Sequence, residues 1–164
     1  NERKSSFLKN LKLNKINFNP NYYASVKLEE PENSFVAQFI GENNTLDGEV
    51  KNLSKNMAVV QLDDGSLINC KPVNVESVGD RTKVSIRPER VEYNKKRINK
   101  QAHTLTAEVL EFIYMGDIFR TRLRVAGNDD FIIKTRNAPD QQRLTAGQKI
   151  EIGWLPEDCR ALDA

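Results

Sequence analysis

The sequence predicts a mainly β protein: a small OB-like barrel built from two intertwined β repeats, with one short N-terminal helix. Three observations lead to this prediction. From Asn43 onward, apolar residues recur at every second position, which is typical of half-buried strands. Turn signals containing glycine separate the apolar runs at regular intervals. The two halves of this region also resemble each other at equivalent places, which indicates an internal duplication.

The N-terminal part differs in its pattern. Residues 1–30 show no clear period and are interrupted by asparagines, so we interpret them as a poorly specified tail. Residues 31–42 are predicted to contain a short amphipathic helix, because Pro31 suits a first helical turn and apolar residues follow at helical spacing. Because the chain begins at Asn1 rather than Met, we expect it to be a fragment of a longer protein.

Residues 43–92 are predicted to form the first repeat. The stretch "TLDGEVKNL" can form a strand, and "MAVVQL" and "SLINC" flank a hairpin turn at Asp64-Gly65. Another strand is predicted in "RTKVSIRPE". Residues 93–102 follow as a basic linker, since "KKRINK" carries four cations and no acid.

Residues 103–164 are predicted to form the second repeat. A long strand in "TLTAEVLEFIYM" is followed by a turn at Gly116-Asp117, and "IFRTRLRVA" alternates apolar residues with arginines. The stretches "FIIKTR" and "QKIEIGW" are further strands, separated by a longer loop at 137–147. Phe119 and Trp154 are expected in the core, because both stand on apolar strand faces.

The repeat is carried by short matching stretches. "TLDGEV" matches "TLTAEV", and "GDRTKVSIRPER" aligns without gaps to "GQKIEIGWLPED". One such unit is too small to bury much core, so two units that pack together or exchange strands would close a barrel. Each unit opens on Thr-Leu and closes on Pro-Glu, and proline ends a strand because it cannot donate to the ladder. The markers are Thr45, Leu46, Pro88 and Glu89, and Thr104, Leu105, Pro156 and Glu157.

Composition excludes several functions. The net charge of +2 gives no overall signature of nucleic-acid binding, and no apolar run is long enough to span a membrane. The chain has two cysteines and one histidine, without the spacing of a metal site. His103 has no nucleophile beside it and is expected at the surface, whereas Cys70 and Cys159 are interpreted as small apolar residues of strands.

A second hypothesis is that the charged residues of the strands form a small-ligand site. The candidates are Asp117, Arg120, Arg122, Arg124, Lys134 and Arg136, because aligned cations can meet an anion. The alternative is that alternating charges simply face water. A polyamine would instead need carboxylates, and Asp63-Asp64 and Asp129-Asp130 are available, although both pairs also suit hairpin turns. A third hypothesis is an OB fold that binds single-stranded nucleic acid, with few aromatic residues to support it.

Four stretches identify a resemblance: "FVAQFIGENNTLDGEV", "VSIRPERV", "EFIYMGD" and "GWLPEDCRALD", in this order. Together they resemble the C-terminal region of ATP-binding subunits of bacterial ABC importers, of the spermidine/putrescine type. The resemblance implies that residues 31–42 correspond to the end of the nucleotide-binding domain. It also implies that 43–92 and 103–164 are the two repeats of a transport-associated OB (TOBE) domain.

The resemblance implies a regulatory and dimerisation domain that lacks the ATPase. A phosphate loop of the form G-x-x-x-x-G-K-[ST] does not occur, since none of the eight glycines precedes Lys-Ser or Lys-Thr. We therefore expect no enzyme activity and no cofactor in this chain, with ATP and Mg²⁺ belonging to the parent ATPase. Expected partners are a second copy, the nucleotide-binding domain and the membrane permease subunits. Nucleic-acid binding and membrane insertion are not expected, and the expected location is cytoplasmic, peripheral on the inner membrane.

Overall fold

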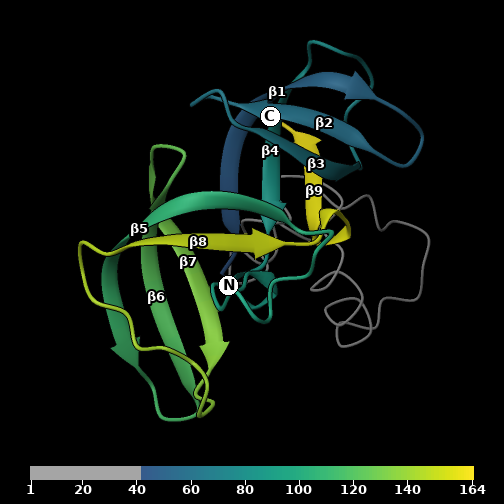
Figure 1. Ribbon diagram of the computed structural model, residues 1–164. Coiled ribbons are helices and arrows are strands. Elements are labelled where there is room, and N and C mark those ends of the chain that lie inside the picture. The colour runs from purple at the N-terminus through teal and green to yellow at the C-terminus, as the bar shows by residue number, and fades with distance from the viewer. Residues whose placement is uncertain (1–41) are drawn as a thin grey trace, which may run out of the picture. The chain divides into compact units, whose positions relative to one another are not determined.

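The computed structural model describes residues 42–164, so the predicted tail and all but the last residue of the predicted helix segment 31–42 lie outside the described residues (Figure 1). The described part is built of strands and two short 3-10 helices. Their bounds are β1 Asn44–Leu53, β2 Ala58–Leu62, β3 Leu67–Pro72, β4 Arg81–Ile86, η1 Pro88–Arg90, β5 His103–Tyr114, β6 Ile118–Val125, β7 Asn128–Arg136, β8 Lys149–Trp154, η2 Pro156–Asp158 and β9 Cys159–Asp163.

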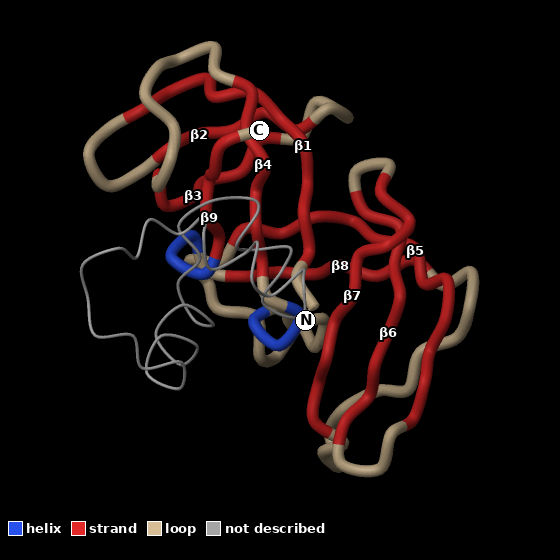
Figure 2. Tube along the Cα trace, turned by 180° about the vertical axis from the view of Figure 1, so that it is seen from behind, coloured by secondary structure: helices blue, strands red, loops and turns tan. Residues whose placement is uncertain are grey.

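The strands form a closed barrel and an open sheet. The barrel has the order β1-β2-β3-β9-β4, and the four-stranded sheet has the order β7-β6-β5-β8. The barrel's last strand, β9, comes from the C-terminal end of the chain, yet it lies beside β3 and β4 in both views (Figures 1 and 2). The predicted mainly β fold with a small barrel is confirmed, and strand exchange between the two halves is how the barrel closes.

The two repeats share the same strand register. In the first repeat, Leu46 lies opposite Val84 in the β1–β4 pair. In the second, Leu105 lies opposite Ile152 in the β5–β8 pair. These are the positions that the gapless sequence alignment pairs. Both pairs point inward, with Val84 and Ile152 fully buried, because the period of two places the same apolar residues on the core face.

A bulge and a glycine turn are also repeated. The ladder of β1 shifts register just after Val50, and that of β5 shifts just after Val109. At each bulge, a glycine from the turn that precedes the partner strand donates a hydrogen bond. Gly79, before β4, donates its N–H to Val50 O at 2.8 Å, and Gly147, before β8, donates its N–H to Val109 O at 2.7 Å. Both glycines have positive φ angles, +96° and +86°, which a side chain would strain.

Each Pro-Glu marker begins a 3-10 helix just after a strand ends. Pro88 opens η1 and Pro156 opens η2, each after a residue in extended conformation. The chain that leaves each helix then pairs with the last strand of the other repeat. Arg160 in β9 lies opposite Ser85 in β4, and Glu92 bonds to Gly153 in β8 at 2.9 and 2.8 Å. The repeats are therefore interlocked by a reciprocal exchange of their ends.

One apolar core joins the barrel and the open sheet. It includes Val60 and Ile86 of the barrel, and Phe131 and Trp154 of the sheet, whose rings lie 6.2 Å apart. The predicted core positions of Trp154 and Phe119 are confirmed, because the two side chains are 2% and 1% exposed. Burial of each such side chain stabilises the fold by about 1.5–3 kcal/mol, which links the two repeats energetically.

A buried asparagine further ties the repeats together. The Asn44 side chain at the start of β1 donates to Ile132 O and accepts from Ile132 N–H, both at 2.7 Å. Asn128, at the start of β7, donates in return to Thr45 O at 2.8 Å. Asn44 thus covers the open edge of β7, whose backbone groups would otherwise be buried without partners.

Candidate functional site

The predicted cationic residues lie on the neighbouring strands β6 and β7. Arg120 is opposite Lys134, and Ile118, two residues before Arg120, is opposite Arg136. Asp117 stands in the turn before β6, where its carbonyl accepts from the N–H of Asn137 at 2.9 Å. The structure therefore brings most of the predicted residues onto adjacent strands, while Asp117 lies at the turn.

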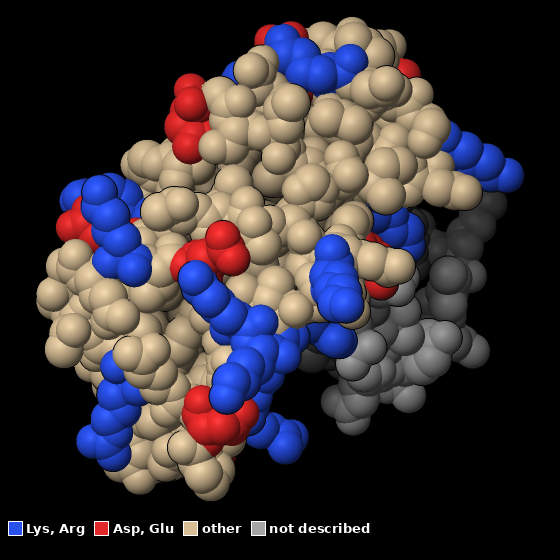
Figure 3. Space-filling view, viewed as in Figure 1, with Lys and Arg blue, Asp and Glu red and all other residues tan. Residues whose placement is uncertain are grey.

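Carboxylates accompany these cations. Arg124 donates to Asp129 at 2.6 Å and also pairs with Glu108 at 3.3 Å, and Arg122 approaches Glu111 at 3.6 Å. The hydrogen bonds from Arg124 hold the pKa of Asp129 below its usual range. Figure 3 shows basic side chains in blue and acidic side chains in red close to one another on the face of the molecule that it draws. The arrangement suits a solvated, ion-paired face.

Glu42 neutralises the other end of this face. Its carboxylate pairs with Arg120 and with Lys134, the latter at 2.7 Å. Partial burial would raise the pKa of Glu42, but the hydrogen bonds from Lys134 and Arg120 outweigh that effect and lower it. An incoming anion would have to compete with Glu42, so the ligand-binding role of these cations stays a prediction.

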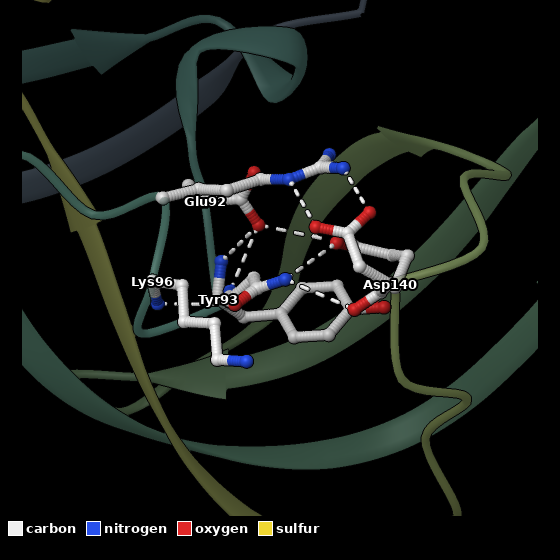
Figure 4. A network of polar contacts seen from close by, with 7 residues as sticks. Glu92, Tyr93, Lys96 and Asp140 are labelled. Atoms are coloured by element: carbon white, nitrogen blue, oxygen red, sulfur yellow. Dashed lines mark hydrogen bonds and ion pairs between the residues drawn. The ribbon is translucent and has the colours of Figure 1, made fainter.

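A second polar region was not predicted from the sequence: the basic linker folds onto the 137–147 loop (Figure 4). Glu92 is its centre. One carboxylate oxygen accepts from the N–H groups of Tyr93 and Asn94, at 2.9 and 2.8 Å, and from the Gln141 side chain at 3.2 Å. Three donors on one oxygen fix the direction in which the chain turns away from its bridge to β8.

The linker is held to the loop by further bonds. Arg97 forms a two-pronged pair with Asp140, with one N–H donating at 3.1 Å. The hydroxyl of Tyr93 donates to Gln142 O at 2.5 Å, and burial raises the pKa of this phenol. In Figure 4 the Tyr93 ring and Asp140 lie close to Glu92, and no dashed line reaches the ammonium group of Lys96.

Between the linker, the loop and β8 lies a hollow of about 400 Å³, which we call the lysine hollow. Lys95, Lys96 and Lys149 line it, and none of them has an ion pair with a described residue. Asp140 also lines it, but Arg97 already neutralises that carboxylate. Glu151 is the opposing charge, so the hollow carries a net positive charge, whereas Arg120, Arg122, Arg124 and Lys134 on β6 and β7 are ion-paired.

The acidic pairs are occupied by turn and strand contacts. Asp63 forms a two-pronged pair with Arg81 at 2.8 and 3.0 Å, and this hydrogen bonding lowers the pKa of Asp63. Asp64 accepts from Ser66 N–H at 2.9 Å inside the hairpin turn. These carboxylates act as turn residues and strand partners, which was one of the two interpretations of the sequence.

The histidine and cysteines are structural. His103 was expected at the surface, and the structure places it half-buried: its Nε2 accepts from Asn69 N–H at 3.0 Å, and burial lowers its pKa. Cys70 and Cys159 are fully buried free thiols with their sulfurs 3.0 Å apart, where β3 meets β9. Burial raises the pKa of the Cys159 thiol, which makes it a poor nucleophile. Residues 42–164 contain no group of three or more potential metal-ligating side chains.

The sequence of the described part matches a known class of domain. Residues 84–162 match the model of the TOBE domain. The match runs from β4 to β9 and so includes both ends that the repeats exchange. In the part of the chain that the structure describes, no helix has the length and apolar character needed to cross a membrane.

Within this class, the chain is similar to spermidine/putrescine import ATP-binding proteins named PotA. It is 31% identical to that of Roseobacter denitrificans over 71% of this chain and 32% of the relative. The identity is 27% for Rubrobacter xylanophilus, over 82% of this chain and 35% of the relative. It is 32% for Nitrosomonas europaea, over 84% and 39%. The chain thus spans about a third of the length of the curated relatives it matches, and the predicted resemblance is confirmed.

A solved structure shares the fold. The cytoplasmic molybdate-binding protein ModG, in a form with molybdate bound, superposes with a TM-score of 0.62 at 13% sequence identity. The match covers 74% of this chain and 96% of ModG. At this identity the likeness shows the fold alone, and it agrees with the OB-like architecture predicted from the repeats.

Proposed function

We propose that this chain is the regulatory and dimerisation module of the ATP-binding subunit of an ABC importer of the polyamine type. The observation that carries the proposal is the TOBE match at 84–162 together with the similarity to spermidine/putrescine import ATP-binding proteins. The module itself does not hydrolyse ATP, because its sequence has no phosphate loop to hold the triphosphate. ATP and Mg²⁺ bind the nucleotide-binding domain of the parent protein.

The proposal includes its partners. The module works beside the nucleotide-binding domain and the permease subunits, on the cytoplasmic side of the inner membrane, and it pairs with a second copy. Three exposed apolar residues at the tip of the β5–β6 hairpin, Ile113, Tyr114 and Met115, support a contact surface, being 37%, 56% and 53% exposed. Exposed apolar clusters of this kind are frequent at protein contacts.

Sedimentation velocity of the isolated chain tests the pairing. We expect a dimer fraction that grows with concentration, and a loss of that fraction when Tyr114 and Met115 are both replaced by serine. A matched control is Leu67→Ser, at a site that is 57% exposed on β3. A strict monomer at high micromolar concentration would remove self-association from the proposal and leave the importer assignment to be tested in the full-length protein.

A second candidate function is the sensing of a small anion. The likeness to a molybdate-bound structure and the cations of β6 and β7 favour it. A thermal-shift series with molybdate, sulfate and spermidine tests this candidate. Stabilisation by an oxyanion, lost in Arg122→Gln, would support it. The absence of any shift at millimolar ligand would count against both anion and polyamine sensing.

A further inference from the structure

The two interlocked repeats differ at one place, where the exchanged end of the first repeat stops short. In the barrel, β9 runs along β4 for several residues: Arg160 lies opposite Ser85, and Leu162 lies opposite Lys83. In the open sheet, the equivalent segment makes only the bridge between Glu92 and β8. The strand that closes the first repeat therefore has only a one-residue counterpart in the second.

A turn at Asn94 ends the second exchange early. Asn94 O accepts from the N–H groups of Arg97 and Ile98, at 2.8 and 3.0 Å, and its side chain accepts from Lys96 N–H at 3.0 Å. If this segment continued along β8 as β9 continues along β4, Asn94 would lie opposite Glu151. Because the chain turns away instead, no strand among residues 42–164 pairs with β8 at that position or at the next one toward Lys149.

The lysine hollow lies at this unfilled position. Its walls include Asn94 and Lys95 from the linker and Lys149, Ile150 and Glu151 from β8. In an antiparallel strand the outward-facing backbone groups alternate, and Gly153 already uses both of its groups on Glu92. The N–H and C=O groups of Glu151 and Lys149 consequently face the hollow, along about 10 Å of open strand edge.

The net positive charge of the lysine hollow favours an occupant with acidic side chains. Lys95, Lys96 and Lys149 surround the open edge without ion pairs to described residues, whereas Asp140 is neutralised by Arg97. Glu151 is the opposing charge within the hollow. An extended segment that carries acidic side chains would satisfy both the backbone edge and the lysines.

We propose that the lysine hollow is an open strand position, which binds an extended acidic segment of a partner protein by adding a strand to β8. The fold itself shows how the position can be filled, because β9 occupies the equivalent place beside β4. This inference goes beyond the proposed function, since it assigns a binding surface that does not depend on self-association or on an importer.

The test uses the whole chain labelled with ¹⁵N and a short synthetic peptide of alternating glutamate and valine, blocked at both ends. Titration is expected to shift the amide signals of Glu151 and Lys149 and to slow the exchange of these amides with solvent. A second peptide has the same charge but N-methyl groups on alternate backbone nitrogens. It is expected to bind at least about tenfold more weakly, because it cannot complete the ladder.

Charge variants locate the site. The double variant Lys96→Glu and Lys149→Glu is expected to weaken binding about fivefold to tenfold, because each lysine would lose one exposed ion pair with the peptide. Lys55→Glu with Lys71→Glu makes the same change in net charge outside the hollow and is expected to weaken binding less than about twofold. Glu151→Gln is expected to strengthen binding, since it removes the opposing charge.

Three outcomes would overturn the proposal. Equal binding of the N-methylated peptide would show that the backbone edge is not used. Tripolyphosphate that binds as tightly as the peptide and shifts the same lysine signals would make the hollow an anion site rather than a strand site. Unchanged amide signals of Glu151 and Lys149 at saturating peptide would place any binding elsewhere.

Discussion

Asn44 gives the sharpest test of how the two repeats are joined. Its side chain is 2% exposed and bonds to both backbone groups of Ile132, at 2.7 Å each, across 88 residues of sequence. In Asn44→Ala these two groups lose their partner inside the protein. Two hydrogen bonds worth about 1 kcal/mol each, plus the cost of leaving buried groups unpaired, give a loss of about 2–4 kcal/mol in the free energy of unfolding.

Urea unfolding followed by the fluorescence of Trp154, the single tryptophan, measures this loss. We expect a lower midpoint with an unchanged slope, and a Tm reduced by roughly 5–15 °C. Asn52→Ala is the matched control, because Asn52 is exposed on the same strand, and it should change stability by less than about 0.5 kcal/mol. If the two variants were equally stable, the buried asparagine would not join the repeats as described.

Three further predictions concern single side chains. Because burial lowers the pKa of His103, the unfolded chain binds a proton at a higher pH than the folded protein does. The free energy of unfolding should therefore be greatest above the ordinary pKa of 6.5 and should fall as the pH drops below it. His103→Gln should flatten this dependence in urea titrations from pH 7.5 to 5. Gly48→Ala places a Cβ 2.6 Å from Gln61 O and should cost about 1–3 kcal/mol by urea unfolding, so an unchanged midpoint would contradict the close approach. Cys70 and Cys159 should react with DTNB only after unfolding in guanidinium, and rapid reaction of the native protein would disprove their burial.

The architecture could be predicted from the sequence because the residues that match between the two repeats face the core. Leu46 and Val84, like Leu105 and Ile152, keep the period of two, and the Pro-Glu markers stand where the strands end. The alignment therefore equated positions that also have the same strand register in the two repeats, although it did not predict that register. What it left open was the choice between packed and exchanged units, since both bury the same apolar faces.

The candidate site was less predictable, for a physical reason. The alternating arginines of β6 were visible in the sequence, but their partners, such as Glu108 for Arg124, come from a neighbouring strand. The lysine hollow exists because the two repeats differ. β9 continues along β4, whereas the equivalent segment of the first repeat turns away from β8 at Asn94. Only the lack of an acid in "KKRINK" pointed toward it, and that run was interpreted as a linker.

The exchanged ends make the two repeats a single folding unit. Native-state hydrogen exchange in low denaturant measures it directly, because it reports the opening free energy of each bonded amide. We expect the bonded amides of β4, such as those paired with β9, and the Gly153 amide in β8 to exchange with the same free energy and the same dependence on denaturant. If the β8 amides opened in a separate, smaller transition while β4 stayed protected, the repeats would be independent and the interlocked unit would be wrong.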